Sequence, residues 1–232
     1  MSKKITMGFL GIYSGFCLFS LAMVCQHHRV FRISGDLAYL GGPSADGYSP
    51  VEMMWWLAIF VPVWLSCGFI LDRLFGYAKM RIYRSKSFSF WWLTVIVKIA
   101  ALNILYFAGF GVILCSNHMI NEKLLNVLIL MVSHSLFMTS MMVWIFFAAG
   151  NIIVSVCSVL ILEVISTILV TAGMKPFFNP FVWGMYNYSE AVYGSDGYGI
   201  IAAVVIQVLF FIVSFCVPSI FKKILMRGIN CC

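Results

Sequence analysis

Charge is scarce in this chain. Only 10% of its 232 residues are charged and 8 of them are acidic, whereas 62% are hydrophobic. A soluble domain carries about 25% charged residues, and a bilayer core of about 30 Å needs runs of about 20 apolar residues. The composition therefore excludes a water-soluble globular protein and predicts an all-α integral membrane protein.

Sequence patterns of catalysis are also lacking. The four histidines (His27, His28, His118 and His134) have no spacing to glutamate or cysteine that would build a metal site. The chain has neither a nucleophile-elbow sequence nor a phosphate-binding Gly-x-x-x-x-Gly-Lys-Ser/Thr loop. We therefore expect a non-catalytic chain that holds no cofactor or metal and does not hydrolyse ATP itself.

Long apolar runs, in contrast, occur along the whole chain and form a single membrane domain. The first run is too long for a signal-peptide core, and no clear small-x-small cleavage site follows it, so it counts as a span. The link 150–151 is so short that the helices on either side of it should form a tight antiparallel hairpin. The six predicted spans are 5–25, 51–71, 90–115, 124–149, 152–172 and 200–221.

Lysine and arginine are distributed unevenly about these spans. With the N-terminus inside, eleven of the 15 basic residues fall on the inner side. The four on the outer side are Arg29, Arg32, Lys123 and Lys175. Basic residues are retained in the cytoplasm, so this asymmetry predicts a multi-pass plasma-membrane protein with both termini cytoplasmic. The same rule accounts for the net charge of +7 without nucleic acid as a partner.

Two of the predicted outer loops are long, at 26–50 and 173–199. The second is rich in aromatic residues and poor in charge, a composition typical of the headgroup level of a membrane. Proline and glycine interrupt it too often for it to span. We expect it to lie on the outer surface or to dip partway into the membrane, where protein or water must satisfy its backbone.

Four polar side chains fall near mid-membrane, one on each of the last four spans: Asn103, His134, Glu163 and Gln207. Glu163 is the only acidic residue buried inside a span, and a lone carboxylate there is costly unless it is protonated, paired or water-exposed. His134 lies at similar depth and is its candidate partner. Two interpretations stay open: a polar pathway or proton-sensitive element, and interhelical hydrogen bonding worth about 1 kcal/mol per bond.

The loop between the second and third spans, DRLFGYAKMRIYRSK at 72–86, is the most basic segment. Trp91-Trp92 and Lys98 follow it. A topology signal with contacts to lipid headgroups would account for these charges. The mixture of basic residues with Met80, Ile82 and Tyr83 also suits a docking element for a cytosolic partner.

This region is similar to the corresponding part of small permease subunits of ABC transporters of the type-2 exporter class. The residues that carry the similarity are Met80-Arg81-Ile82-Tyr83-Arg84-Ser85-Lys86, Trp91-Trp92 and Lys98. The outer stretch NPFVWGM at 179–185 resembles the loop before the last span in that family. Six spans, inner termini and a basic tail also agree, so the resemblance covers nearly the whole chain.

The resemblance implies a half-transporter that pairs, among membrane lipid, with a second copy of itself or a related permease. A separate cytosolic ATPase, which binds ATP and Mg, would dock on the 72–88 loop. The outer segment would contain short helices that re-enter the membrane and cap the pathway, with Phe181, Trp183 and Tyr186 in the cap. The implied activity is export or extraction of a peptide or lipid-like hydrophobic substrate. The implied ATPase-coupling residues are Lys79, Met80, Arg81, Ile82, Tyr83, Arg84 and Ser85.

Two other classes of function stay open. One is the substrate-binding membrane subunit of a vitamin-type importer, which is also a small six-span protein that works with separate ATPases. Such subunits usually contact a scaffold subunit through small-residue helix surfaces, whereas a basic cytoplasmic loop dominates here. The other class is an intramembrane enzyme built on Glu163 and His134.

Overall fold

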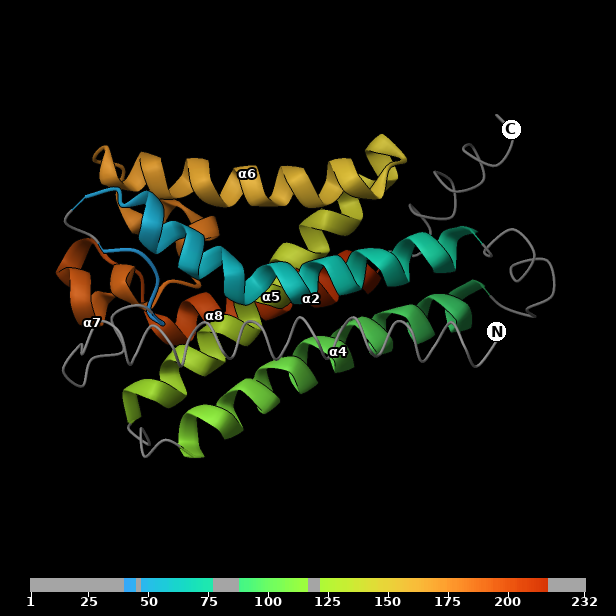
Figure 1. The fold of residues 1–232 in the computed structure, drawn as a ribbon, viewed down its shortest axis with the longest axis horizontal. Coiled ribbons are helices and arrows are strands. Elements are labelled where there is room, and N and C mark those ends of the chain that lie inside the picture. Colours follow the sequence, from blue (N-terminus) through green and yellow to red (C-terminus); the bar gives the residue numbers. More distant parts are fainter. Residues whose placement is uncertain (1–39, 45–46, 77–87, 117–121, 217–232) are drawn as a thin grey trace.

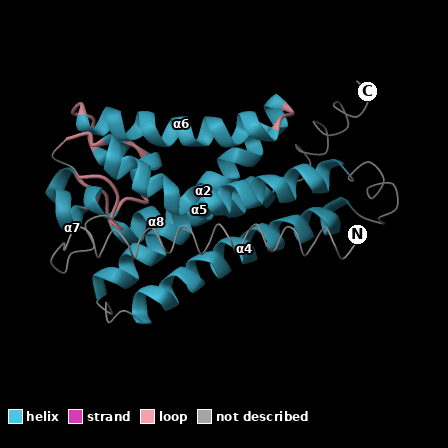
Figure 2. Cartoon of the chain, viewed as in Figure 1, coloured by secondary structure: helices cyan, strands magenta, loops and turns pink. Residues whose placement is uncertain are grey.

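The computed structural model describes residues 40–44, 47–76, 88–116 and 122–216 (Figure 1). Within these ranges the chain forms helices and turns without a named strand, and an isolated β-bridge joins Ser189 to Tyr198 (Figure 2). The described part is therefore all-helical, as the composition predicts. The predicted first span, 5–25, and the predicted coupling residues, 79–85, lie outside the described residues.

Five long helices make up most of the described chain. Each begins within two residues of a predicted span, and α2 continues five residues past its predicted end. Four of them, α2, α4, α5 and α6, are long and apolar enough to cross a membrane, and α8 is a shorter apolar helix. Their bounds are α2 Pro50–Gly76, α4 Phe88–Ser116, α5 Glu122–Ala149, α6 Ile152–Thr171 and α8 Ile200–Cys216.

Apolar residues cover these helices on every side instead of forming a single stripe. Val97 and Leu105 of α4 and Ile161 of α6 are each more than half exposed. A helix that is apolar all round is typical of a membrane span, because its outer face meets lipid and not water. The helices thus indicate a membrane protein.

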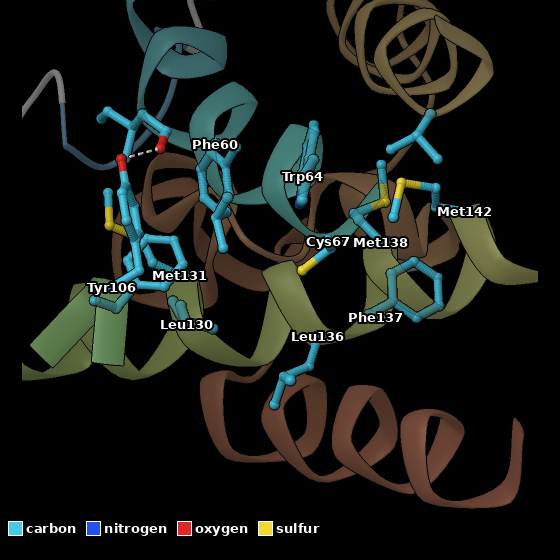
Figure 3. Packing of buried hydrophobic residues seen from close by; sticks show 14 of the residues in the cluster. Phe60, Trp64, Cys67, Tyr106, Leu130, Met131, Leu136, Phe137, Met138 and Met142 are labelled. Carbon is cyan, nitrogen blue, oxygen red and sulfur yellow. Dashed lines mark hydrogen bonds between the residues drawn. The ribbon is translucent and has the colours of Figure 1, made fainter. Parts of the chain in front are cut away.

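Helix α5 lies at the centre and packs against α2, α4, α6 and α8. Its buried Leu130, Met131 and Phe137 belong to one hydrophobic cluster with Phe60 and Trp64 of α2 (Figure 3). The phenol of Tyr106, from α4, donates a 2.7 Å hydrogen bond to the carbonyl of Ile59 and ties α4 to α2. The core is therefore a layer of aromatic, leucine and methionine side chains around α5.

A two-residue turn joins α5 to α6, which confirms the predicted hairpin. Gly150 has φ of 66°, a left-handed conformation that glycine adopts without steric cost. The Asn151 side chain accepts hydrogen bonds from the backbone N–H groups of Ile153 and Val154 and so caps α6. These two residues reverse the chain and start the next helix.

The segment 173–199, between α6 and α8, folds into short helical turns at one end of the bundle (Figure 1). Residues 40–44 lie on this segment. The backbone N–H of Asn187 donates to Gly41, and its side-chain amide donates to Gly42 at 2.6 Å. The two long predicted outer loops therefore contact each other. The turns are η2 Pro176–Phe178, η3 Pro180–Val182, η4 Tyr186–Tyr188, α7 Glu190–Tyr193 and η5 Gly194–Asp196.

Candidate functional site

An acid–base pair lies inside the helix bundle. Glu163 of α6 and His134 of α5 are both fully buried. The Nε2 atom of His134 lies 3.0 Å from Oε1 and 3.2 Å from Oε2 of the carboxyl group. The predicted contact between these residues is confirmed, and the pairing meets the requirement that a carboxyl group at membrane depth have a partner.

The same carboxyl group binds a tryptophan of α2. The indole Nε1–H of Trp56 donates to Oε1 of Glu163 at 2.8 Å, and Trp56 is fully buried. Trp56 is not among the residues predicted from the sequence. A signal was present, because a buried indole N–H needs an acceptor and Glu163 is the only acidic side chain near the middle of a predicted span.

A glutamine of α8 extends the network on the other side of the imidazole. Nε2 of Gln207 lies 3.4 Å from Nδ1 of His134, and the hydroxyl of Ser133 donates to Oε1 of Gln207 at 3.0 Å. We refer to Trp56, Glu163, His134, Gln207 and Ser133 as the Glu163 network. It joins α2, α5, α6 and α8.

Aromatic rings surround the imidazole. Phe60 meets it edge to face with ring centroids 5.6 Å apart, and Trp64 and Phe137 lie at 6.5 Å. Two ion pairs occur among the described residues, and only the His134–Glu163 pair is buried. Charge on this pair is therefore weakly screened, and its energy depends on the hydrogen bonds within the network.

The fourth predicted polar residue, Asn103, belongs to a separate cluster. Its side-chain amide donates to the carbonyl of Ile99 at 2.9 Å and approaches the sulfur of Cys67 at 3.5 Å. The hydroxyl of Ser135 donates to its Oδ1 at 2.5 Å. Asn103 thus joins α4 to α2 and α5, a pattern that fits interhelical hydrogen bonding.

The outer segment reaches the network directly at Gly184. A Cβ atom at this position would overlap the imidazole of His134, so only glycine fits against the ring. Thr167 of α6 donates to the backbone carbonyl of Glu163 at 3.0 Å, and its hydroxyl lies 3.8 Å from the sulfur of Met185. The segment therefore contacts His134 at Gly184 and contacts α6, one turn from Glu163, at Met185.

The three predicted cap residues are half-buried members of this segment. The ring of Phe181 packs against Phe137 of α5 with centroids 5.7 Å apart. The indole N–H of Trp183 donates to the carbonyl of Pro176 at 3.0 Å, within the segment itself. Tyr186 packs against the hydrophobic core. Phe181 thus packs its ring directly against α5.

Two buried tyrosines hold the outer segment together. The phenol of Tyr198 donates to the carbonyl of Met185 at 2.8 Å, and that of Tyr188 donates to Ser44. Burial raises the pKa of both phenols, with smaller contributions at Tyr188 from Tyr193 and Glu52. Both side chains therefore remain neutral donors at physiological pH.

No family model matches this chain, and no curated protein or solved structure matches it either. A function for the Glu163 network is therefore inferred from its geometry. The network can hold a proton between two buried groups and can tie four helices together. Among the described residues, no group of three or more metal-ligating side chains occurs.

An apolar groove of about 420 Å³ lies beside the network, between α4, α5 and α8. Ser133 is the one lining residue with a polar side chain, so the network ends at the wall of this groove. The other lining residues are Ile104, Phe107, Ala108, Gly111, Leu128, Ile129, Val132, Leu136, Val204 and Val208.

Proposed function

We propose that this chain is the membrane-spanning subunit of an ATP-driven transporter that exports or extracts a peptide or lipid-like hydrophobic substrate. It spans the plasma membrane six times with both termini in the cytoplasm. A second copy or a related permease completes the pathway. A separate cytosolic ATPase binds ATP and Mg and docks on the 72–88 loop.

The position of Gly184 is the observation that carries the proposal. His134 lies ~18 Å along α5 from the start of that helix, at 1.5 Å per residue. Glu163 lies ~12 Å before the end of α6 by the same measure. Because Gly184 contacts the imidazole of His134, the outer segment penetrates between the helices instead of resting on their ends. This supports a partly re-entrant cap above a polar interior.

The direction of the helices supports the predicted side of the coupling loop. The C-terminal end of α2 and the N-terminal end of α4, which flank the loop, lie at the same end of the bundle as the α5–α6 turn (Figure 1). The outer segment lies at the opposite end. A docking loop on one side and a cap on the other is the arrangement that an ATPase-driven permease requires.

The Glu163 network fits this function as the contact that closes the pathway. It joins α2, α5, α6 and α8 and lies directly below the cap. Movement of the ATPase, transmitted through the 72–88 loop to α2 and α4, would separate these helices and break the network. The polar side chains would then line an open path.

Charge reversal in the coupling loop tests the proposal. We expect the double variant R81E/R84E to insert in the membrane at the wild-type level but to lose the ATPase during affinity purification in mild detergent. The matched control is K222E/K223E, which makes the same charge change in the predicted cytoplasmic tail. Recovery of the ATPase is measured by quantitative mass spectrometry.

Equal recovery of the ATPase with both double variants would contradict the coupling assignment. Wild-type protein that brings down no protein with a phosphate-binding loop would contradict the transporter. A scaffold protein recovered together with two ATPases would replace the exporter with the importer subunit.

A further inference from the structure

The hydroxyl group of Ser133 can donate its single hydrogen to either of two acceptors. Its hydroxyl oxygen lies 3.0 Å from Oε1 of Gln207 and 3.0 Å from the backbone carbonyl of Leu130. A hydroxyl has one donor and can also accept. Rotation of this O–H toward the Leu130 carbonyl leaves the Ser133 oxygen free to accept a hydrogen bond on the side of Gln207, without movement of the oxygen itself.

Gln207 has the same ability. The oxygen and the nitrogen of its side-chain amide are nearly equal in size, so a half-turn exchanges a donor for an acceptor in the same space. One end of the amide faces Nδ1 of His134 and the other faces Ser133. A half-turn of Gln207 together with rotation of the Ser133 hydroxyl reverses the direction of both hydrogen bonds.

The first state of the network has one proton on the buried pair. In this state the amide N–H of Gln207 faces Nδ1 of His134, 3.4 Å away, and the ring nitrogen accepts this hydrogen bond and carries no hydrogen. The ring proton is then on Nε2 and is donated to the Glu163 carboxylate, which also accepts from Trp56. The pair has a net charge of −1 in this state.

A second proton can be added without leaving a donor unpaired. With hydrogen on Nδ1 of His134, Gln207 turns its oxygen to the ring and its N–H groups to Ser133. Ser133 accepts from the amide and donates to the carbonyl of Leu130. The pair is then neutral overall, whether as imidazolium with carboxylate or as imidazole with carboxylic acid. Removing net charge from the membrane interior lowers the cost of burial.

We propose that the Glu163 network is a buried proton-binding site that holds one or two protons and reverses Gln207 and Ser133 between these states. The groups facing the pair from the elements packed against it are the aromatic rings of α2, Phe137 of α5, Gln207 of α8 and the backbone at Gly184. No further titratable or charged side chain contacts the pair among the described residues. The site lies within one chain and does not depend on an ATPase.

Nitrogen NMR of the full chain in lipid nanodiscs tests the proposal. The variant H27N/H28N/H118N leaves His134 as the only histidine, and Gln26 is the only other glutamine. With ¹⁵N-labelled histidine and glutamine, Nδ1 of His134 should change from a lone-pair signal to a protonated signal as the pH falls. The side-chain amide signal of Gln207 should shift over the same pH interval.

Two further variants, each made in H27N/H28N/H118N, test the role of Gln207. Q207E places an acceptor-only carboxylate beside Nδ1, so Nδ1 should stay protonated to higher pH than in the parent. S140A is the matched control, because Ser140 is a buried serine of α5 that donates only to the carbonyl of Leu136 in its own helix. Its titration should match the parent.

The proposal would be overturned if the Nδ1 signal of His134 stayed unchanged over the whole pH range in which the protein elutes as a folded species. A change at Nδ1 without a change at the Gln207 amide would also overturn it. Q207E and S140A with the same midpoint would contradict the role of Gln207. These outcomes are independent of whether an ATPase is recovered with the chain.

Discussion

Two ion pairs of nearly equal length occur in opposite surroundings in this molecule. The His134–Glu163 pair, at 3.0 Å, is fully buried between α5 and α6. The Lys175–Asp196 pair, at 2.8 Å, lies in the outer segment with more than half of each side chain exposed. The distance between the paired atoms therefore does not distinguish the two pairs. The groups that surround each pair do.

The buried pair differs from the exposed pair in what its loss would leave behind. Burying a charge costs several kcal/mol, which its hydrogen bonds and its paired group have to offset. Removing one partner leaves the other charge and its donors buried and unpaired. The exposed pair has water as a replacement partner, so its loss leaves nothing unsatisfied. The following predictions separate these two situations.

The substitution Glu163→Ala should give the largest effect. It removes the acceptor of both Trp56 and His134, and breaking a buried pair in this way costs roughly 3–5 kcal/mol of the free energy of unfolding. Denaturant titration of the protein in mixed micelles measures the change. Glu190→Ala, at an exposed carboxylate of α7, is the control. Equal destabilisation by the two substitutions would show that the buried pair carries no special energy.

Two tryptophans of α2 isolate the hydrogen bond from the packing. Trp56 and Trp64 are both buried, but within the described residues the indole N–H of Trp64 has no acceptor. Trp→Phe removes the same volume at each site, and only at Trp56 does it remove a bond to a carboxyl group. We expect W56F to destabilise more than W64F by about 1.5–3 kcal/mol in the same titration. A larger effect of W64F would mean that packing and not the indole bond dominates at this site.

The sequence was sufficient to predict the helices and the buried pair. Runs of about 20 apolar residues have one stable form in a bilayer, because a helix satisfies its own backbone hydrogen bonds. Counting residues along the spans then placed His134 and Glu163 at equal depth, and the cost of a lone carboxylate required a partner. These are local or composition-based arguments, so they did not need the tertiary fold.

The other contacts of the network required the fold. Depth alone grouped Asn103 with His134, but the rotation of α4 directs Asn103 to Cys67 and Ser135 instead. The contact of Gly184 with His134 depends on a path of the outer segment that has no periodic pattern. Side chains on different elements meet because of helix rotation and loop path, and neither follows from spacing in the sequence.

The exposed pair should give the smallest effect, and pH and salt are its best probes. Its hydrogen bond to Asp196, and then the charge of Asp196, raise the pKa of Lys175 above its ordinary value of 10.5. A raised pKa in the folded state means that the contribution to stability is complete below about pH 10.5 and is lost as the pH rises through the raised value. Salt should weaken it at neutral pH, because exposed charges are screened. When salt is added, we expect the melting temperature of the wild type to fall slightly more than that of K175Q. We expect E163Q to show the same salt response as the wild type, because its altered site is shielded from solvent. Identical salt responses of the wild type and K175Q would mean that the exposed pair contributes nothing measurable.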